Sequence, residues 1–241
     1  MKLFGFAGTA HKPSFTAGII ERLSDELKKE CVIDTAVIVR ASDADIMMCK
    51  GCLSCYQSGK CVFDDQDDMT NLKNELLSSD IVVFGSPVYV HDVSGAMKNF
   101  IDRFLVWMYM YKLVGKTAVT VSTSSSNGNI FVDKYLQKVL KIMGANVAGS
   151  ISVNMFTTPD EIESQISKCC GSLKDAIENG ITEPDELQEQ YFSATRQTLT
   201  HPAAKGYLVD YWKEKDLAEF ERYMDYYNSY SQNVIQEANK W

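Results

Sequence analysis

The stretch that decides the fold is Ile81-Val-Val-Phe-Gly-Ser-Pro-Val-Tyr-Val-His-Asp-Val-Ser-Gly-Ala-Met-Lys-Asn-Phe-Ile-Asp-Arg103. Its first residues form a continuous apolar run, which is typical of a strand buried on both faces of a parallel sheet. A strongly apolar helix is expected from Ser94 to Met108. The loop between them carries Ser86, Pro87, Val88 and Tyr89, at the strand end where open α/β sheets bind ligands. The stretch therefore predicts one strand–loop–helix unit with a binding loop.

The same kind of unit recurs on both sides of this stretch. Further strands are expected at residues 2–7, 32–39, 117–122 and 146–153, and helices at 14–29, 68–79, 130–143 and 159–178. Strands that alternate with helices of this length imply right-handed crossovers and a parallel sheet covered on both faces. Residues 1–180 are thus predicted to form one α/β domain with a doubly wound, five-stranded parallel sheet.

The composition changes after residue 180. Residues 181–241 are rich in charged and aromatic residues up to Trp241, and we expect two or three helices there, the last over residues 215–238. Four tyrosines follow each other at helical spacing and share one face, which must be buried: Tyr223, Tyr226, Tyr227 and Tyr230. This helical extension is interpreted first as an oligomer contact, and otherwise as a lid or as helices packed on their own domain.

The overall charge and the cysteine count restrict the class of protein. The 241 residues include 24 Lys and Arg against 32 Asp and Glu, a net charge of −8, which argues against nucleic-acid binding. Apolar runs are too short for a signal peptide or a membrane span. Seven cysteines, an odd number, indicate a reducing compartment rather than a secreted disulfide framework. We therefore expect a soluble cytoplasmic protein without membrane or nucleic-acid partners.

Four cysteines lie within thirteen residues: Cys49, Cys52, Cys55 and Cys61. The spacing C-x2-C-x2-C-x5-C brings four thiolates close enough to bind one iron–sulfur cluster, and it resembles cluster-binding runs more than the paired knuckles of zinc sites. A [4Fe–4S] cluster is the first interpretation. Zinc in a closed tetrahedral site and a loop without metal remain as alternatives.

A second loop of interest, Gly8 to Thr16, follows the first expected strand and leads into a helix. The N-terminus of a helix offers unpaired N–H groups and the positive end of its dipole, which suit a phosphate monoester. The hydroxyls of Thr9, Ser14 and Thr16 add donors, and His11 or Lys12 adds positive charge. A capped turn without a ligand is the alternative for this loop taken alone.

Together the loops resemble the flavodoxin-like NAD(P)H-dependent FMN reductase superfamily. Residues 85–103 match its pattern [GS]-[TS]-P-[VI]-Y-x4-[SP]-[GA]-x-[ML]-K-x-[FW]-x-D-R nearly completely. The first loop departs from G-S-P-R-x-x-[GS]-x-T, because Thr9, Ala10 and His11 replace Ser, Pro and Arg. The cysteine run, followed by Asp67-Asp68-Met69, is similar to the iron–sulfur flavoprotein branch.

The resemblance implies bound FMN and assigns three sets of residues to it. The phosphate would be held by Thr9, His11, Ser14, the backbone N–H of Phe15, and Thr16. The ring would be flanked by Ser86, Pro87, Val88 and Tyr89. A third loop would meet the ring or the ribityl chain through Ser122, Ser124, Asn127 and Gly128. No catalytic side chain is assigned, and Asp102 and Arg103 are interpreted as structural.

The implied function is an FMN-dependent oxidoreductase that moves electrons from NAD(P)H, a transient donor, or from a one-electron donor. The acceptor is a small molecule or a protein, reached directly or through the cluster, and a homodimer or homotetramer is expected. Two alternatives remain: a non-catalytic electron carrier of the flavodoxin type, and a redox sensor whose cysteines oxidise to disulfides.

Overall fold

A computed structural model describes residues 1–181, 183 and 185–238; Trp241 lies outside them. Its central sheet has five parallel strands in the order β2-β1-β3-β5-β6, and a short strand, β4 (Asp92–Val93), pairs antiparallel with β3. The parallel strands are β1 (Lys2–Ala7), β2 (Thr35–Arg40), β3 (Ile81–Tyr89), β5 (Thr117–Ser124) and β6 (Asn146–Asn154). This is the flavodoxin-like strand order, so the predicted doubly wound parallel sheet is confirmed.

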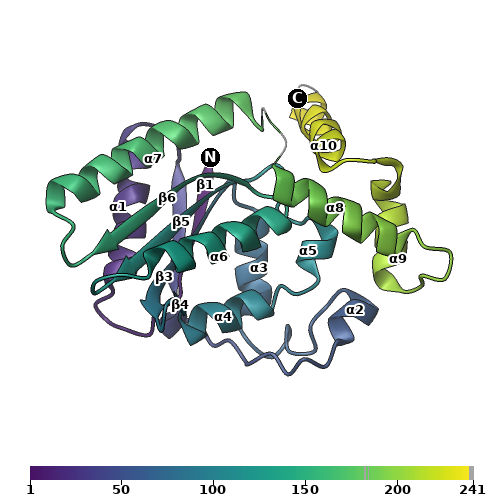
Figure 1. Cartoon of the computed structure of the whole chain (residues 1–241), viewed down its shortest axis with the longest axis horizontal. Coiled ribbons are helices and arrows are strands. Elements are labelled where there is room, and N and C mark those ends of the chain that lie inside the picture. The colour runs from purple at the N-terminus through teal and green to yellow at the C-terminus, as the bar shows by residue number, and fades with distance from the viewer. Residues whose placement is uncertain (182, 184, 239–241) are drawn as a thin grey trace.

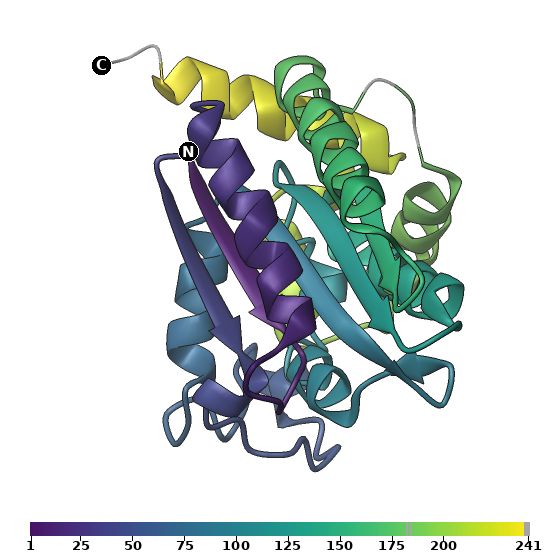
Figure 2. The same cartoon turned by 90° about the vertical axis from the view of Figure 1, so that its left-hand side faces the viewer.

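Helices cover both faces of this sheet (Figures 1 and 2). On one face, α1 (Phe15–Lys29) and α7 (Pro159–Asn179) bury residues such as Leu23 and Ile166 against the strands. On the other face lie α3 (Met69–Leu77), α4 (Gly95–Asp102) and α6 (Asn129–Ile142), with Phe100 and Leu136 in a second apolar core. The strands are therefore buried on both sides, as their near-continuous apolar sequences predict.

The helix expected over residues 94–108 is interrupted, which corrects that prediction. Helix α4 ends at Asp102, and a separate turn of helix, α5 (Trp107–Met110), follows. The N–H groups of Phe104 and Trp107 donate to carbonyls three residues back, at 3.0 and 2.8 Å, so the chain tightens and turns. Phe104 and Trp107 thereby enter the same core, with their rings 4.7 Å apart.

The last expected helix, over residues 215–238, is also shorter than predicted. The extension consists of α8 (Glu186–Leu199), α9 (Tyr207–Glu214), a 3-10 turn η2 (Leu217–Glu219) and α10 (Tyr223–Ala238). Asp216 adopts a left-handed backbone with φ of 52°, which no α-helix accommodates, so α9 and α10 are separate.

Helix α10 runs along the amino ends of the strands, as Figure 2 shows. Tyr223 and Tyr227 are buried among Tyr111, Phe192 and neighbouring aromatic rings, and the Tyr223 hydroxyl donates to the Gly144 carbonyl at 2.7 Å. These two tyrosines thus pack on their own chain. The edge that α10 covers is opposite the predicted FMN loops, so its position does not suit a lid over them.

Helix α9 lies elsewhere, against a short helix in the cysteine loop, α2 (Ser54–Ser58). Gly59 ends α2 with φ of +74°, and a β-carbon there would lie 2.2 Å from the Tyr207 ring. The extension therefore supports the cysteine loop from outside. Among the described residues, no helix is long and apolar enough to cross a membrane.

Candidate functional site

Three loops meet at the carboxyl ends of the central strands β1, β3 and β5. The N–H of Gly8 donates to the Gly85 carbonyl at 2.7 Å, which joins the first loop to the second. The Thr16 and Thr123 hydroxyls, 2.6 Å apart, join the first loop to the third. These three loops are the ones to which the sequence assigns FMN, so the residues predicted to bind it share one edge of the sheet.

The start of α1 has the donor groups that a phosphate requires. Ser14 caps the helix by accepting from the Ala17 N–H at 3.1 Å, and no acidic residue lies in the first turn. The backbone N–H groups of Phe15 and Thr16, at the first two helical positions, have no intrahelical acceptor. They are left for a ligand at the positive end of the helix dipole. This donor set fits the phosphate of FMN.

Two of the predicted serines instead hold the loops in place. Ser86 is fully buried; its hydroxyl accepts from the Ser94 N–H at 3.0 Å and donates to the Pro87 carbonyl at 2.9 Å. Ser122 is also fully buried, and its hydroxyl accepts from the Asn129 amide at 3.0 Å. Their side chains support the binding edge from below, whereas Tyr89 is about half exposed above it.

The loop after β3 ends in a strained hairpin tip. Val90 and His91 have φ of 53° and 59°, a left-handed backbone that is unfavourable for a β-branched residue, and Val90 is fully exposed. His91 lies 3.1 Å from the Asn127 amide oxygen, and a β-carbon on Gly128 would lie 2.7 Å from Val88. The tip therefore contacts the third loop. Backbone strain of this kind is typical of ligand-binding segments.

The four cysteines lie in an irregular loop beside these three loops. Burial raises the pKa of the Cys55 thiol, and the charges of Cys61 and Cys49 raise it further. Cys52 is exposed, and its pKa is lowered chiefly by a hydrogen bond with Ser54. Within residues 1–181, 183 and 185–238, the side chains are not arranged as a metal site of three or more His, Cys, Asp or Glu ligands.

The surroundings of the cysteine loop nevertheless suit a negatively charged cluster. Arg103 is buried with its side chain fully shielded, and its Nε has no hydrogen-bond partner among the described residues. Burial tends to lower the pKa of Arg103, but Asp67 and Cys61 raise it above its usual value. Cys61 lies beside Arg103, because its N–H donates to Asp64, which also pairs with the guanidinium. Four cysteines in one loop beside a buried cation suit a cluster with four thiolate ligands.

The sequence did not reveal the role of Arg103 in this site. Asp102 and Arg103 are both interpreted from the sequence as structural, and Asp102 indeed forms an exposed ion pair with Lys98, four residues before it. Arg103 in fact binds the segments on both sides of the cysteine run, through Met47, Asp64 and Asp67. The acidic residues that follow the last cysteine were the available signal.

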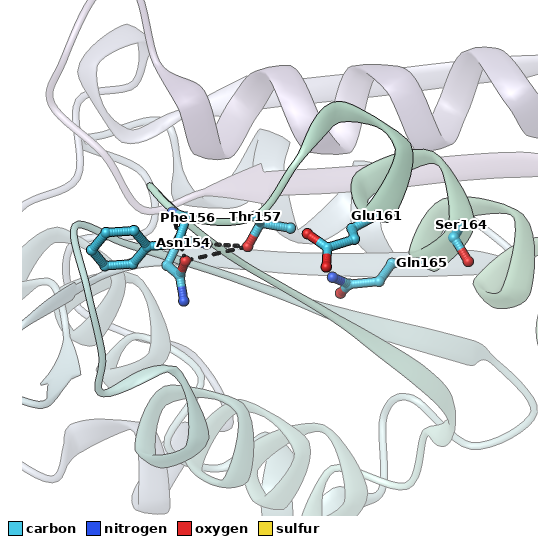
Figure 3. A pocket seen from close by; sticks show the side chains of 6 residues that line it. All are labelled: Asn154, Phe156, Thr157, Glu161, Ser164 and Gln165. Carbon is cyan, nitrogen blue, oxygen red and sulfur yellow. Dashed lines mark hydrogen bonds between the residues drawn. The ribbon is translucent and has the colours of Figure 1, made fainter.

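A separate hollow of about 460 Å³ lies beside the end of the outer strand β6 (Figure 3). Its polar groups serve the local turn: the Asn154 side chain accepts from the Phe156 N–H at 2.9 Å and from the Thr157 hydroxyl at 3.4 Å. The residues that line it belong to β6, α7 and the turn between them: Asn154, Phe156, Thr157, Glu161, Ser164 and Gln165. The predicted FMN residues belong to other loops.

Comparison with known proteins gives a consistent result. A family described as NADPH-dependent FMN reductase matches residues 1–158. An iron–sulfur flavoprotein of Archaeoglobus fulgidus is 28% identical over 222 residues, which cover 89% of this chain and 99% of that protein. The crystal structure of an NADH:FMN oxidoreductase in its apo form has a TM-score of 0.56 at 18% identity, covering 76% of this chain and 91% of that one. A flavodoxin, WrbA-like protein from Agrobacterium tumefaciens has a TM-score of 0.51 at 13% identity, covering 73% and 97%.

Proposed function

Because the chain belongs to the NADPH-dependent FMN reductase family and its iron–sulfur flavoprotein branch, we propose that it passes electrons from NAD(P)H or a one-electron donor to a small-molecule or protein acceptor. FMN, when bound, supplies the hydride and electron chemistry. The observation that carries the proposal is the convergence of three loops at one sheet edge, with the cysteine loop beside them.

The residues of these loops divide into three roles in the proposed complex. The helix start and its loop hold the phosphate, through Thr9, His11, Ser14, Thr16 and the N–H of Phe15. The second loop flanks the ring: Pro87, Val88 and Tyr89 contact it, and Ser86 fixes the loop beneath it. In the third loop Ser124, Asn127 and Gly128 face the ring or ribityl chain, and Ser122 anchors the strand end.

The four cysteines Cys49, Cys52, Cys55 and Cys61 are proposed to hold one [4Fe–4S] cluster. Their spacing and the buried charge of Arg103, which binds the segments on both sides of the run, support this assignment. Binding of the cluster would use Cys52 as the fourth ligand. The neighbours of Cys52 in the chain, Gly51 and Leu53, both have positive φ.

An exposed apolar rim around the carboxyl edge supports docking of a partner there, either a second copy of the chain or an electron acceptor. Scattered exposed apolar side chains are ordinary, but a set gathered around one edge indicates an interaction surface. The rim consists of Phe15, Met48, Leu53, Val62, Tyr89, Val90, Ile130, Phe131, Met155 and Phe156. A homodimer or homotetramer is the first expectation, and light scattering of the purified protein measures it.

The test is anaerobic purification of the whole chain, followed by its visible spectrum and assays for iron and sulfide. We expect bound FMN with four iron and four sulfide per chain. A protein with flavin but with zinc or no metal would overturn the cluster assignment and leave the flavin assignment standing. A colourless protein that does not take up added FMN would overturn both.

A stopped-flow experiment distinguishes the enzyme from its alternatives. Rapid bleaching of the flavin by NADH or NADPH identifies an NAD(P)H-dependent oxidoreductase. Reduction only by a partner protein identifies an electron carrier. A loss of four free thiols on peroxide treatment of the iron-free protein, with no iron in the native one, identifies a redox sensor.

A further inference from the structure

One helix holds the cysteine loop at its beginning. Asn99 lies in α4, and Arg103 directly follows the last residue of that helix. Because the two are four residues apart, their side chains extend from the same side of α4. The Asn99 side chain donates to the Ile46 carbonyl at 2.9 Å and accepts from the Cys49 N–H at 3.2 Å. The Arg103 Nη1 donates to the Met47 carbonyl at 2.9 Å. The segment that leads into Cys49 is therefore fixed to α4.

Arg103 also fixes the segment that follows the last cysteine. Its guanidinium pairs with Asp67, whose side chain is completely shielded from solvent, and with Asp64 at 3.1 Å. Asp64 in turn accepts from the Cys61 N–H at 3.2 Å and pairs with Lys73 at 2.7 Å. A single buried cation thus connects both ends of the cysteine run.

The same guanidinium has hydrogen-bonding capacity that the protein leaves unused. The Nε of Arg103 is buried and has no partner among the described residues, although a buried unpaired donor carries a cost in free energy. Cys61 lies beside this guanidinium, because Asp64 accepts from the Cys61 N–H and also pairs with Arg103. A sulfur that carries negative charge is the acceptor that would satisfy this N–H.

We propose that Arg103 is a positioning residue that donates a hydrogen bond to the Cys61 sulfur and raises the reduction potential of the cluster. The inference rests on the proposed function, in which the four cysteines hold a [4Fe–4S] cluster. Reduction adds one electron and hence one negative charge to the cluster. A fixed positive charge in a buried site stabilises that added charge more strongly than it would in water.

The test compares charge changes of opposite sign at the same place. The cluster potential is measured by redox titration followed by electron paramagnetic resonance, on the anaerobically purified whole chain. Arg103→Gln removes the cation, and we expect a shift to more negative potential of about 59 mV, a tenfold change in a one-electron equilibrium. Asp67→Asn removes the neighbouring anion while it preserves the shape of the side chain, and it shifts the potential in the opposite direction.

A matched control is available at the surface. Arg22 pairs with Glu163 on the face that α1 and α7 cover, and both side chains are substantially exposed. Arg22→Gln removes the same charge from a solvated pair and leaves the potential unchanged. Arg103→Lys keeps the charge without the Nε donor, so its potential should lie between those of the native protein and of Arg103→Gln.

The outcomes separate this inference from the proposed function. A native protein without iron and sulfide overturns both. A native protein with the cluster, whose potential is unmoved in Arg103→Gln and Asp67→Asn or moves in the same direction in both, overturns the role of Arg103 alone. If Arg103→Gln does not fold, Asp67→Asn and Arg103→Lys decide the matter, because both keep a cation at position 103.

Discussion

The three loops proposed to bind FMN (the flavin loops) and the cysteine loop occupy the same edge of the molecule, but different forces hold them. The flavin loops continue directly from strands, and neutral hydrogen bonds join them, such as the contact between Thr16 and Thr123. The cysteine loop follows β2 and a short 3-10 turn, η1 (Ala41–Asp43), and returns to α3 without a sheet to guide it. Buried ion pairs centred on Arg103 hold it in place.

The difference follows from what each region is proposed to bind. A flavin phosphate is bound by backbone N–H groups, so a rigid strand-to-helix turn is sufficient. A cluster with four thiolates carries net negative charge in a partly buried place, and a fixed cation offsets that charge. Helix α4 serves both, because Ser94 at its beginning bonds the Gly8 carbonyl and Arg103 at its end binds the cysteine loop.

The largest expected effect is the loss of the buried cation. Arg103→Leu leaves the buried carboxylate of Asp67 without its ion-pair partner and leaves Asp64 with Lys73 alone, and it should lower the free energy of unfolding by about 3–5 kcal/mol. Arg22→Leu, which breaks an exposed pair, should cost at most about 1 kcal/mol. Urea denaturation of the two variants measures both. Equal losses would mean that the cysteine loop does not depend on Arg103.

The corresponding test in the flavin loops concerns a steric contact. A β-carbon on Gly8 would lie 2.4 Å from Met97 Cβ on α4, so Gly8→Ala forces the first loop away from the start of α4. We expect a loss of about 1–3 kcal/mol in unfolding free energy and weaker FMN binding, read by flavin fluorescence. Gly18→Ala in α1 meets no atom within 4 Å and should stabilise the protein slightly, by up to about 1 kcal/mol.

These two regions also show what the sequence could and could not predict. Apolar runs such as Ile81–Phe84 and the loops that follow them predict the parallel sheet and its binding edge, since strand burial and crossover handedness are general rules. The break of the helix after Asp102 escaped prediction, because the placement of Phe104 and Trp107 in a shared core decides it. The contacts of Arg103 also escaped prediction, because its partners Asp67 and Asp64 are 36 and 39 residues away in the chain.

A third prediction uses acid to separate buried from exposed charge. Desolvation opposes ionisation of Asp67, but Arg103 and the N–H groups of Met69 and Met47 outweigh it and lower its pKa. Asp67 therefore stabilises the fold above its unfolded pKa of about 3.9 and loses this contribution as the pH falls through the folded value. The difference in stability between the native protein and Asp67→Asn should shrink as the pH falls below about 4.

Exposed Asp43 provides the comparison for this titration. Hydrogen bonds with Lys12 and Arg40 lower the pKa of Asp43 to about 2, and both of these ion pairs lie at the surface. The effect of Asp43→Asn should fade in about 1 M salt, where the screening length is about 3 Å, whereas the effect of Asp67→Asn should persist. A similar salt dependence for both would show that the charges around Arg103 are not sequestered from solvent.

The smallest expected effect lies at the strained tip of the second flavin loop. At φ of 53° alanine remains strained and glycine does not, so Val90→Gly should be more stable than Val90→Ala by roughly 1 kcal/mol, the reverse of the usual order. Because Val90 is fully exposed, neither change removes a packing contact within the chain. Thermal denaturation of the two variants gives the stability order. If alanine is the more stable residue here, the hairpin tip does not hold its left-handed conformation, and strain is not what distinguishes this loop.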